Sequence, residues 1–306
     1  PPDPTPSLSD CEPPEEPPHL ADAPLPGAAA PAAKPDDTLP VIVVNNRQLP
    51  DISREALYAL MAANNPPTVF VRAGQLVRVE HDEHARPVIR ALSLDALAGE
   101  LARAARFVRL NDSGDLRSVL PPPAVVRDVA SLPYRPFPRL AGIIEAPTIR
   151  PDGSILSTPG YDAATGLFYD PAPGLTVPPI PEAPTDEQVQ TALETIHNVL
   201  WDFPFKDAAS QAHAYALILT PILRPYIRGH VPFILVDKPQ AGTGAGLLTE
   251  VAALTATGRP AALMTAPDDE AEWTKVLTAL LMEGASFVSI DNIEGRLSSA
   301  VLAAVI

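Results

Sequence analysis

A glycine-rich loop between an apolar segment and a helix constrains the fold more than any other part of the chain. The sequence from 232 to 248 is PFILVDKPQAGTGAGLL. In a phosphate-binding loop, glycines follow a strand, and successive backbone N–H groups face the phosphates together with the positive end of the next helix. The order of residues therefore predicts a strand over 233–236, a phosphate loop over 242–246 and a helix over 247–256.

This loop lacks two side chains that phosphate-binding loops normally carry. Ala245 stands at the position of the usual lysine, and Gly246 stands at the position of the usual serine or threonine. The lysine normally adds a charge-assisted hydrogen bond of roughly 1.5–3 kcal/mol, and the hydroxyl contacts Mg²⁺. Glycines 242, 244 and 246 keep the backbone part, and Thr243 adds a hydroxyl. We expect phosphate binding to survive and turnover to fall.

Two other cations lie close to the loop in the sequence. Lys238 precedes the loop, and Arg259 follows the end of the predicted helix. Either could reach a phosphate, but their positions favour a solvated or helix-dipole role for both.

A second motif is an apolar strand that ends in an acid. Residues 286–290 read SFVSI and precede Asp291 and Asn292. An acid at such a strand end holds Mg²⁺ through water in phosphate-loop proteins. Glycine turns and strands that end in Asp are both common, so each motif alone also fits an ordinary turn. Together, in this order and spacing, they favour a P-loop fold.

The residues after 230 alternate between strand and helix patterns. Further strands are expected at 261–264 and 286–290, and further helices at 268–283 and from 297 onward. Alternating units of this length predict a parallel sheet with right-handed crossovers. With three strands and a final apolar run that has no stop signal, we expect an α/β protein with a truncated P-loop (ASCE-type) core over 231–306, in a piece of a longer protein.

Composition divides the rest of the chain. Thirteen prolines and eight acids in residues 1–40 predict a disordered Pro/Ala-rich linker, which contains the single cysteine, Cys11, so that neither an internal disulfide nor a cysteine zinc site is expected. The other expected units are a small α+β accessory domain over 41–120, a Pro/Gly-rich segment with a β-hairpin over 121–183, and a two-helix collar over 184–230.

Local patterns predict the elements of these units. In the accessory domain we expect a strand at 41–44, a helix at 51–61, a hairpin that turns at Ala73 and Gly74, and a helix over 95–108. A short helix is expected at 124–130 and a hairpin at 160–169. The collar consists of helices over 185–201 and 208–227, the first capped by Thr185.

Charge gives a mixed indication about partners. The formal net charge is −15, which argues against a nucleic-acid partner. Residues 41–150, however, hold fourteen arginines and eleven acids, and arginine suits phosphate groups better than lysine does. A solvated surface and a nucleic-acid face both remain open. No uncharged apolar stretch of about 18 residues exists, so we expect no membrane partner and a cytoplasmic location.

Three short motifs resemble those of a known family. They are VDKPQAGTG at 236–244 with LL at 247–248, IDNIEG at 290–295, and GYDxxTGLFY at 160–169. The first two resemble the ATPase module of phage and plasmid primase-helicases, related to superfamily three and AAA+ proteins. The third resembles the segment that precedes this module in the same proteins. The similarity extends over residues 40–306 and is strongest in these motifs.

The resemblance implies a set of site residues and partners. Gly242, Thr243 and Gly244 would contact ATP phosphates, with Ala245 and Gly246 completing the loop. Asp291 would bind Mg²⁺, and Asn292 stands where many relatives have a catalytic glutamate. The implied partners are DNA, single-stranded in particular, and further copies of the full-length protein in a ring. The binding of ATP and Mg²⁺ would be weakened or lost in this chain.

Three functions are consistent with these features. The leading one is a fragment of an ATP-dependent DNA helicase or primase-helicase of a mobile element, whose catalysis is impaired in this chain. The rival is a non-catalytic module that binds nucleic acid or protein on a degenerate P-loop scaffold. A small-molecule kinase ranks last because no acceptor-binding signature is visible. The run HDEH at 81–84 fits an acidic turn better than a metal site, since it lacks helical spacing.

Overall fold

The computed structural model describes residues 39–133, 135–240, 242–293, 295 and 297–305. The chain divides into Pro1–Leu39 and Pro40–Ile306, and all the elements given below belong to the second unit. Cys11 lies outside the described residues, as does the predicted linker over 1–40 except for its last two residues. The second unit mixes helices with small sheets, which confirms the α/β class at this level.

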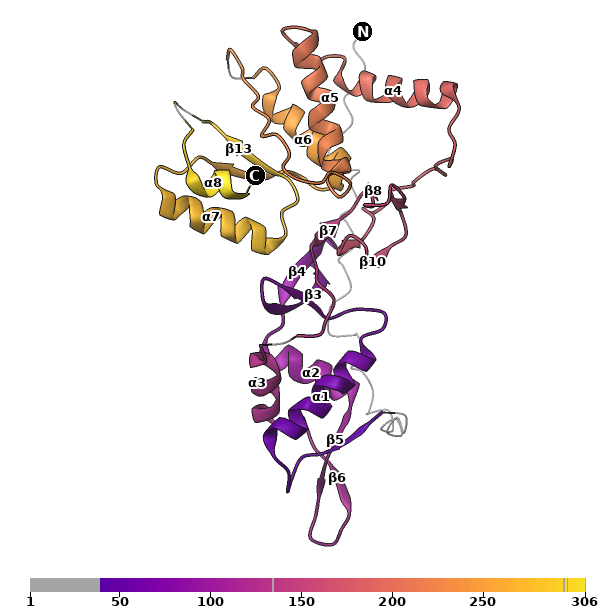
Figure 1. Ribbon diagram of the computed structural model, residues 1–306, viewed down its shortest axis with the longest axis vertical. Coiled ribbons are helices and arrows are strands. Elements are labelled where there is room, and N and C mark those ends of the chain that lie inside the picture. Colours follow the sequence, from indigo (N-terminus) through magenta and orange to yellow (C-terminus); the bar gives the residue numbers. More distant parts are fainter. Residues whose placement is uncertain (1–38, 134, 241, 294, 296, 306) are drawn as a thin grey trace, which may run out of the picture. The chain divides into compact units, whose positions relative to one another are not determined.

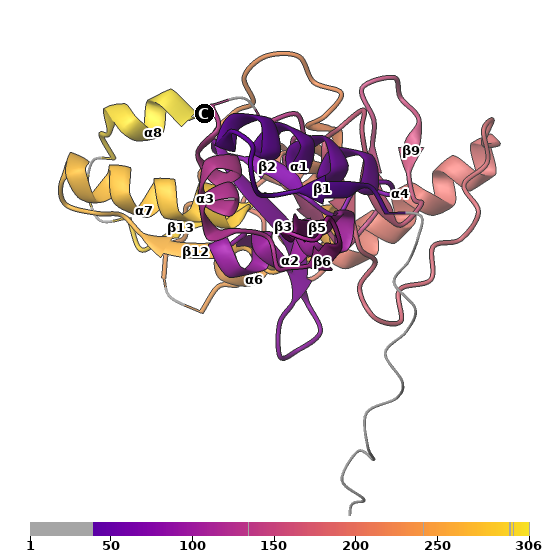
Figure 2. The same cartoon turned by 90° about the horizontal axis from the view of Figure 1, so that it is seen from below.

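The first part of the unit packs three helices against a small sheet (Figures 1 and 2). The helices are α1 (Leu49–Ala63), α2 (Leu94–Ala104) and α3 (Pro123–Ser131). The sheet has the order β1-β5-β6, from β1 (Val41–Val43), β5 (Arg106–Leu110) and β6 (Leu116–Ser118). Strand β1 is parallel to β5, and β6 is antiparallel to it. Apolar residues of all three helices and of β1 and β5 form the largest core cluster of the described chain.

One predicted helix is shorter than the sequence pattern indicated. The expected helix over 95–108 ends at Ala104, and Arg106–Leu110 forms strand β5 instead. Ala105 is extended, with φ −150° and ψ 154°. Phe107 and Val108 are both 2% exposed, so pairing with β1 buries apolar surface that a longer helix would have placed elsewhere. Here a long-range contact outweighs the local helical pattern.

Short strands connect this part to the helices that follow. A meander joins β2 (Phe70–Arg72), β3 (Gln75–His81) and β4 (Pro87–Ala91). Its first turn lies at Ala73 and Gly74, both at positive φ, which confirms that predicted hairpin. A second sheet has the order β10-β11-β7, and β8 pairs with β9. These strands are β7 (Gly142–Ile144), β8 (Thr148–Ile149), β9 (Ile155–Leu156), β10 (Gly160–Asp162) and β11 (Leu167–Tyr169).

The last part alternates helices with two parallel strands. Its elements are α4 (Asp186–Leu200), α5 (Ala208–Leu223), α6 (Ala245–Thr257), β12 (Ala262–Thr265), α7 (Glu270–Glu283), β13 (Val288–Asp291) and α8 (Ala300–Val305). Strands β12 and β13 pair in parallel, as predicted for the order strand, helix, strand. Helix α5 ends at Leu223 instead of Ile227, just before Pro225, which has no N–H to donate.

The predicted strand over 233–236 is absent. The described chain forms no strand there, and the parallel sheet predicted for residues 231–306 consists of two strands, β12 and β13, instead of three. Its side chains nevertheless alternate between packed and exposed positions. Ile234 and Val236 pack on the cluster formed by α5 and α6, whereas Phe233 and Leu235 are exposed. The strand prediction for this segment is therefore wrong, although two of its four apolar side chains pack on the protein.

Candidate functional site

The glycine loop turns directly into helix α6. Gly244 precedes the first helical residue, Ala245, and has φ 90°. Gly242 has φ 81°, so both positions use a backbone conformation that suits glycine. A Cβ atom on Gly244 would lie 3.5 Å from the ring of Phe203, whereas one on Gly242 or Gly246 would meet nothing within 4 Å. The loop is therefore held on one side and open on the other.

The backbone amides of this loop are free to donate. Within the described residues, the amides from Gly242 to Leu247 have no hydrogen-bond acceptor. The next amide, that of Leu248, donates to the Gly244 carbonyl at 2.9 Å. A helix leaves its first four amides unpaired, so those of Gly242 and Thr243 are additional donors supplied by the loop.

Helix α6 also differs from its neighbours in how it begins. Thr185, Asp207 and Asp269 cap α4, α5 and α7 by accepting a hydrogen bond from a backbone amide of the first turn. Helix α6 has no side-chain cap and no acid in its first turn. Among the described residues, neither a side-chain cap nor a first-turn acid compensates its positive end, which is the electrostatic condition for holding an anion.

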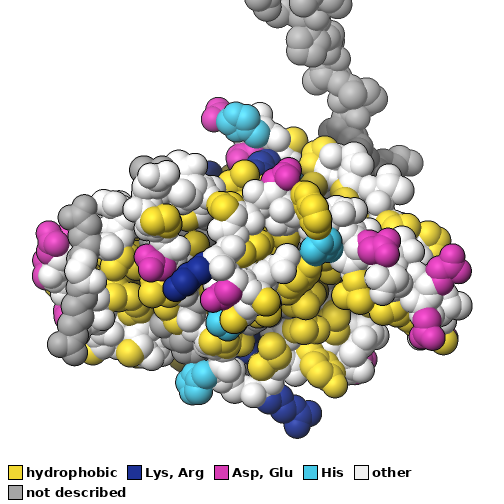
Figure 3. Space-filling view, turned by 90° about the horizontal axis from the view of Figure 1, so that it is seen from above, with side chains coloured by type: hydrophobic (Ala, Val, Ile, Leu, Met, Phe, Trp, Pro, Cys, Tyr) yellow, Lys and Arg dark blue, Asp and Glu magenta, His cyan; other side chains and the backbone are white. Residues whose placement is uncertain are grey.

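Side chains add little to the loop. The Thr243 hydroxyl donates to the carbonyl of Gln240 at 3.2 Å, so it fixes the turn. Ala245 offers no polar atom, and the open space at Gly246 would accommodate a larger side chain. Figure 3, which views this end of the unit, shows broad apolar areas with only scattered Lys and Arg side chains. An anion at this loop would therefore be held by the backbone.

Asp291 lies at the end of β13 and next to a cation. Its carboxylate Oδ1 accepts a hydrogen bond from the Asn292 amide at 2.8 Å and lies 3.9 Å from the Lys238 Nζ. Asn292 has φ 54°, and the Asp291 side chain is 56% exposed. Lys238 is therefore a solvent-exposed cation with a long ion pair to Asp291. It links the segment before the glycine loop to the acid that ends β13, so these two segments lie beside each other.

The residues fit ATP better than they fit Mg²⁺. The free amides form a donor set that suits phosphate oxygens. Asp291 offers one carboxylate, and the described residues contain no group of three or more His, Cys, Asp or Glu that could hold a metal ion. A polar hollow of about 460 Å³ opens nearby, past the ends of β12 and β13, and acids from the start of α7 line part of it. None of the loop residues contributes to that hollow.

Most of the aromatic and histidine side chains that the sequence singled out contact other residues of the described chain. The pair Phe203 and Phe205 packs on the α5–α6 cluster, and Trp201 is 69% exposed. The Nδ1 atom of His197 lies 2.7 Å from the Tyr215 hydroxyl. In the 81–84 turn, the Nε2 atom of His81 is 2.7 Å from Asp170.

A buried charge cluster had no sequence signal. Glu145 is 1% exposed, and its carboxylate lies 3.3 Å from Arg86 and 3.2 Å from Arg259. Burial lowers the pKa of Arg259, and Glu145 acts in the opposite direction. Gly258, at the end of α6, touches the same place, since a Cβ there would lie 2.6 Å from the Glu145 backbone. The cluster joins the β3–β4 turn to the end of α6.

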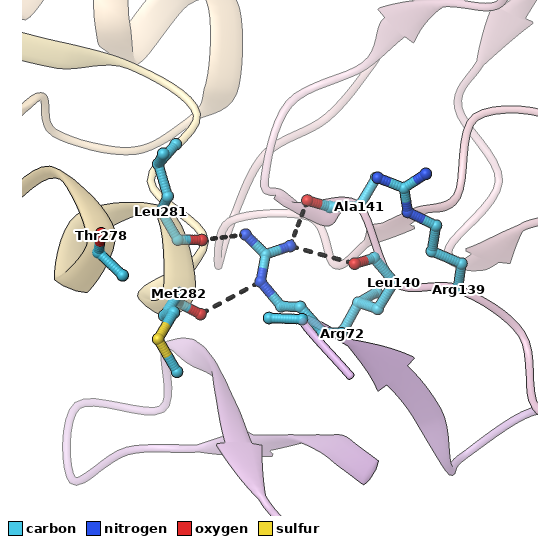
Figure 4. Close-up of a pocket in the computed structure, with 8 residues that line it drawn as sticks. Arg72, Arg139, Leu140, Ala141, Thr278, Leu281 and Met282 are labelled. Atoms are coloured by element: carbon cyan, nitrogen blue, oxygen red, sulfur yellow. Dashed lines mark hydrogen bonds between the residues drawn. The ribbon is translucent and has the colours of Figure 1, made fainter. Parts of the chain in front are cut away.

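Arg72 forms a second connection that the sequence did not reveal (Figure 4). Its guanidinium donates to the carbonyls of Leu140 and Met282, each at 3.1 Å, and to those of Ala141 and Leu281. These contacts line a cavity of about 410 Å³. Burial, and secondarily the charge of Arg139, lower the pKa of Arg72. The residue ties strand β2 to the last turn of α7, where carbonyls attract a cation.

Comparisons with known proteins gave no match: no family model, no curated protein and no solved structure is similar to this chain. No helix in the described ranges is both long and apolar enough to span a membrane.

Proposed function

We propose that this chain is part of an ATP-dependent DNA helicase or primase-helicase, and that its glycine loop binds nucleotide phosphates through the backbone. The observation that carries the proposal is the uncapped start of α6, where the amides from Gly242 to Leu247 have no acceptor among the described residues. Six consecutive unpaired donors at a helix start suit a polyphosphate better than they suit water alone.

The neighbouring residues assign roles within this proposal. Asp291 would hold Mg²⁺, which when bound screens the charge of the phosphates. Asn292 would position a water molecule, but an amide cannot accept a proton as a glutamate can. The loop lacks the lysine at 245 and the hydroxyl at 246, so ATP hydrolysis is impaired more than ATP binding. The helicase assignment rests on the three resembling motifs, and single-stranded DNA and a ring of full-length copies belong to the same proposal.

A matched pair of glycines tests the binding step. Gly242 and Gly174 have φ 81° and 80°, and a Cβ on either would meet nothing within 4 Å. Binding of a fluorescent ATP analogue should weaken severalfold in Gly242→Ala and stay unchanged in Gly174→Ala. If the unaltered chain and the Ala245→Lys variant both fail to bind the analogue, the proposal is wrong.

The rival function is a non-catalytic module on the same scaffold. Ala245 and Gly246 favour it, because both side chains needed for turnover are missing. The double variant Ala245→Lys/Gly246→Ser, placed in the full-length protein, separates the two. Appearance of ATP hydrolysis and strand separation supports the helicase, whereas unchanged inactivity with intact folding supports the module.

A further inference from the structure

Strands β5 and β6 form a hairpin that extends beyond helices α1, α2 and α3 (Figure 1). Arg109 of β5 is directly opposite Arg117 of β6. All three residues of β6 are exposed, and both arginines are exposed as well. Two guanidinium groups are therefore presented side by side on one face of a solvent-facing hairpin.

Neither arginine has a partner in the described chain. No hydrogen bond or ion pair there involves the side chain of Arg109 or Arg117. The acids in the hairpin turn are Asp112 and Asp115, and the Asp115 carboxylate accepts a hydrogen bond from the Asn111 amide group at 3.2 Å. By contrast, two exposed arginines on the helices are paired, Arg54 with Asp51 and Arg103 with Glu100.

The pairing is unfavourable for the isolated hairpin. Like charges directly opposite each other on an antiparallel pair of strands destabilise that pair. An anion placed between the two guanidinium groups removes this repulsion, and phosphate matches their forked donors. The other face of the hairpin presents the opposed pair Leu110 and Leu116, which are 41% and 51% exposed. A partner with both charged and apolar surfaces would cover both faces.

We infer that the β5–β6 hairpin is a nucleic-acid contact surface, with Arg109 and Arg117 binding backbone phosphates. The apolar pair on the opposite face suits the sugars and bases of the same strand. The inference shares its choice of partner with the proposed function, but it does not depend on nucleotide binding at the glycine loop. Phosphodiester chemistry is common to DNA and RNA, so the test includes both.

The experiment measures how salt affects binding of labelled oligonucleotides to the full 306-residue chain. Fluorescence anisotropy would be recorded with one sequence of about 20 nucleotides as single-stranded DNA, duplex DNA and single-stranded RNA. On a single strand, each phosphate that a protein cation neutralises contributes about 0.7 to the slope of log K against log salt. That slope should therefore fall by about 1.4 in Arg109→Ala/Arg117→Ala. Arg109→Lys/Arg117→Lys should keep most of the slope.

The matched control is Arg54→Ala/Arg103→Ala, which removes the same charge from exposed helix positions that are paired with acids. It should leave the slope unchanged. Equal decreases in the two double variants would reduce the effect to net charge and overturn the inference, as would an unaltered chain that binds no oligonucleotide. Equal competition by polyglutamate would indicate an acidic protein partner and also overturn it.

Two further measurements keep this test separate from folding and from the ATP proposal. The Arg109→Ala/Arg117→Ala variant removes a repulsion, so its melting temperature should equal or exceed that of the unaltered chain. Gly242→Ala should leave the salt slope unchanged. If ATP binding fails while the hairpin effect remains, only the proposed function is wrong; if the hairpin variants bind normally while ATP binds, only this inference is wrong.

Discussion

Residues 40–131 and residues 185–305 differ in how they are held together. The first region has one continuous core in which α1, α2 and α3 share buried apolar residues with β1 and β5. The second has small clusters, and its strand β12 buries Met264 while Leu263 is 68% exposed. Its helices rely instead on local devices, such as the Asp269 cap of α7 and the positive-φ glycines that end α6 and α7.

The comparison shows where each region is sensitive to substitution. In the first region, stability depends on long-range packing, so deletion of core atoms should be costly. In the second, single caps and turns determine whether a helix begins and ends in place. The candidate phosphate loop lies in the second region, where α6 lacks the side-chain cap that α4, α5 and α7 have.

The largest predicted effect is in the core of the first region. Phe107→Ala should lower the free energy of unfolding by about 3–5 kcal/mol, because it removes a fully buried aromatic ring from β5. Leu263→Ala, on the exposed face of β12, is the matched control and should change it by about 0.5 kcal/mol at most. Urea denaturation followed by circular dichroism measures both. Similar decreases in the two variants would contradict the difference between the regions.

A second prediction concerns the link between the regions. Arg72→Met removes hydrogen bonds from a charged group to the last turn of α7, and hydrogen bonds to charged groups contribute about 1.5–3 kcal/mol each when well formed. We expect the free energy of unfolding to fall by about that much and unfolding to separate into two steps. Arg139→Met removes an exposed guanidinium that has no partner in the described chain, and should keep a single transition. A single transition in both variants would show that Arg72 does not couple the regions.

Local signals in the sequence predicted local structure well. The Thr185 cap, the Ala73–Gly74 turn and the hairpin with Gly166 at positive φ all form as expected. Each depends on residues within a few positions of one another, so the pattern contains most of the physical information. The parallel pairing of β12 with β13 also followed from the order of the elements.

Contacts between distant segments could not be predicted in this way. No local pattern indicated that β5 would pair with β1, or that Glu145 would be buried between Arg86 and Arg259. The same applies to the site. The loop glycines and Asp291 belong to recognisable motifs, whereas no motif indicated that Lys238 would lie beside Asp291. The inward faces of Leu97 and Leu101 were predicted correctly from their spacing, but Leu94 of the same predicted face is 47% exposed, and no pattern indicated the partner of a buried residue.

A smaller effect is expected at the start of α4. Its capping box joins the Thr185 hydroxyl to the Gln188 amide and the Gln188 side chain to the Thr185 amide. Thr185→Ala should reduce the local stability of the helix by about 1 kcal/mol and speed hydrogen exchange of its amides roughly fivefold, because Leu200 alone is buried among its described residues. Thr191→Ala, inside the same helix, should leave exchange unchanged or slower, since alanine favours the helix. Equal acceleration would show that packing holds α4.

The smallest predicted effect is a pH dependence at the junction of α7 and α8. The Glu270 carboxylate accepts hydrogen bonds from the amides of Ala300 and Val301 and from the Ser299 hydroxyl, and the first of these contributes most to lowering its pKa below the ordinary 4.5. A lowered pKa means that the folded state favours the ionised form, so the stabilisation is fully present above pH 4.5 and is lost as the pH falls through the lowered value. Hydrogen exchange at Ala300 and Val301 should therefore accelerate below pH 4.5, beyond the intrinsic pH dependence of exchange. Glu270→Gln should abolish this extra acceleration, because its side chain does not titrate. If the variant and the unaltered chain showed the same profile, the carboxylate would not be what holds α8 to α7, and the second region would lack one of the local contacts on which its comparison with the first depends.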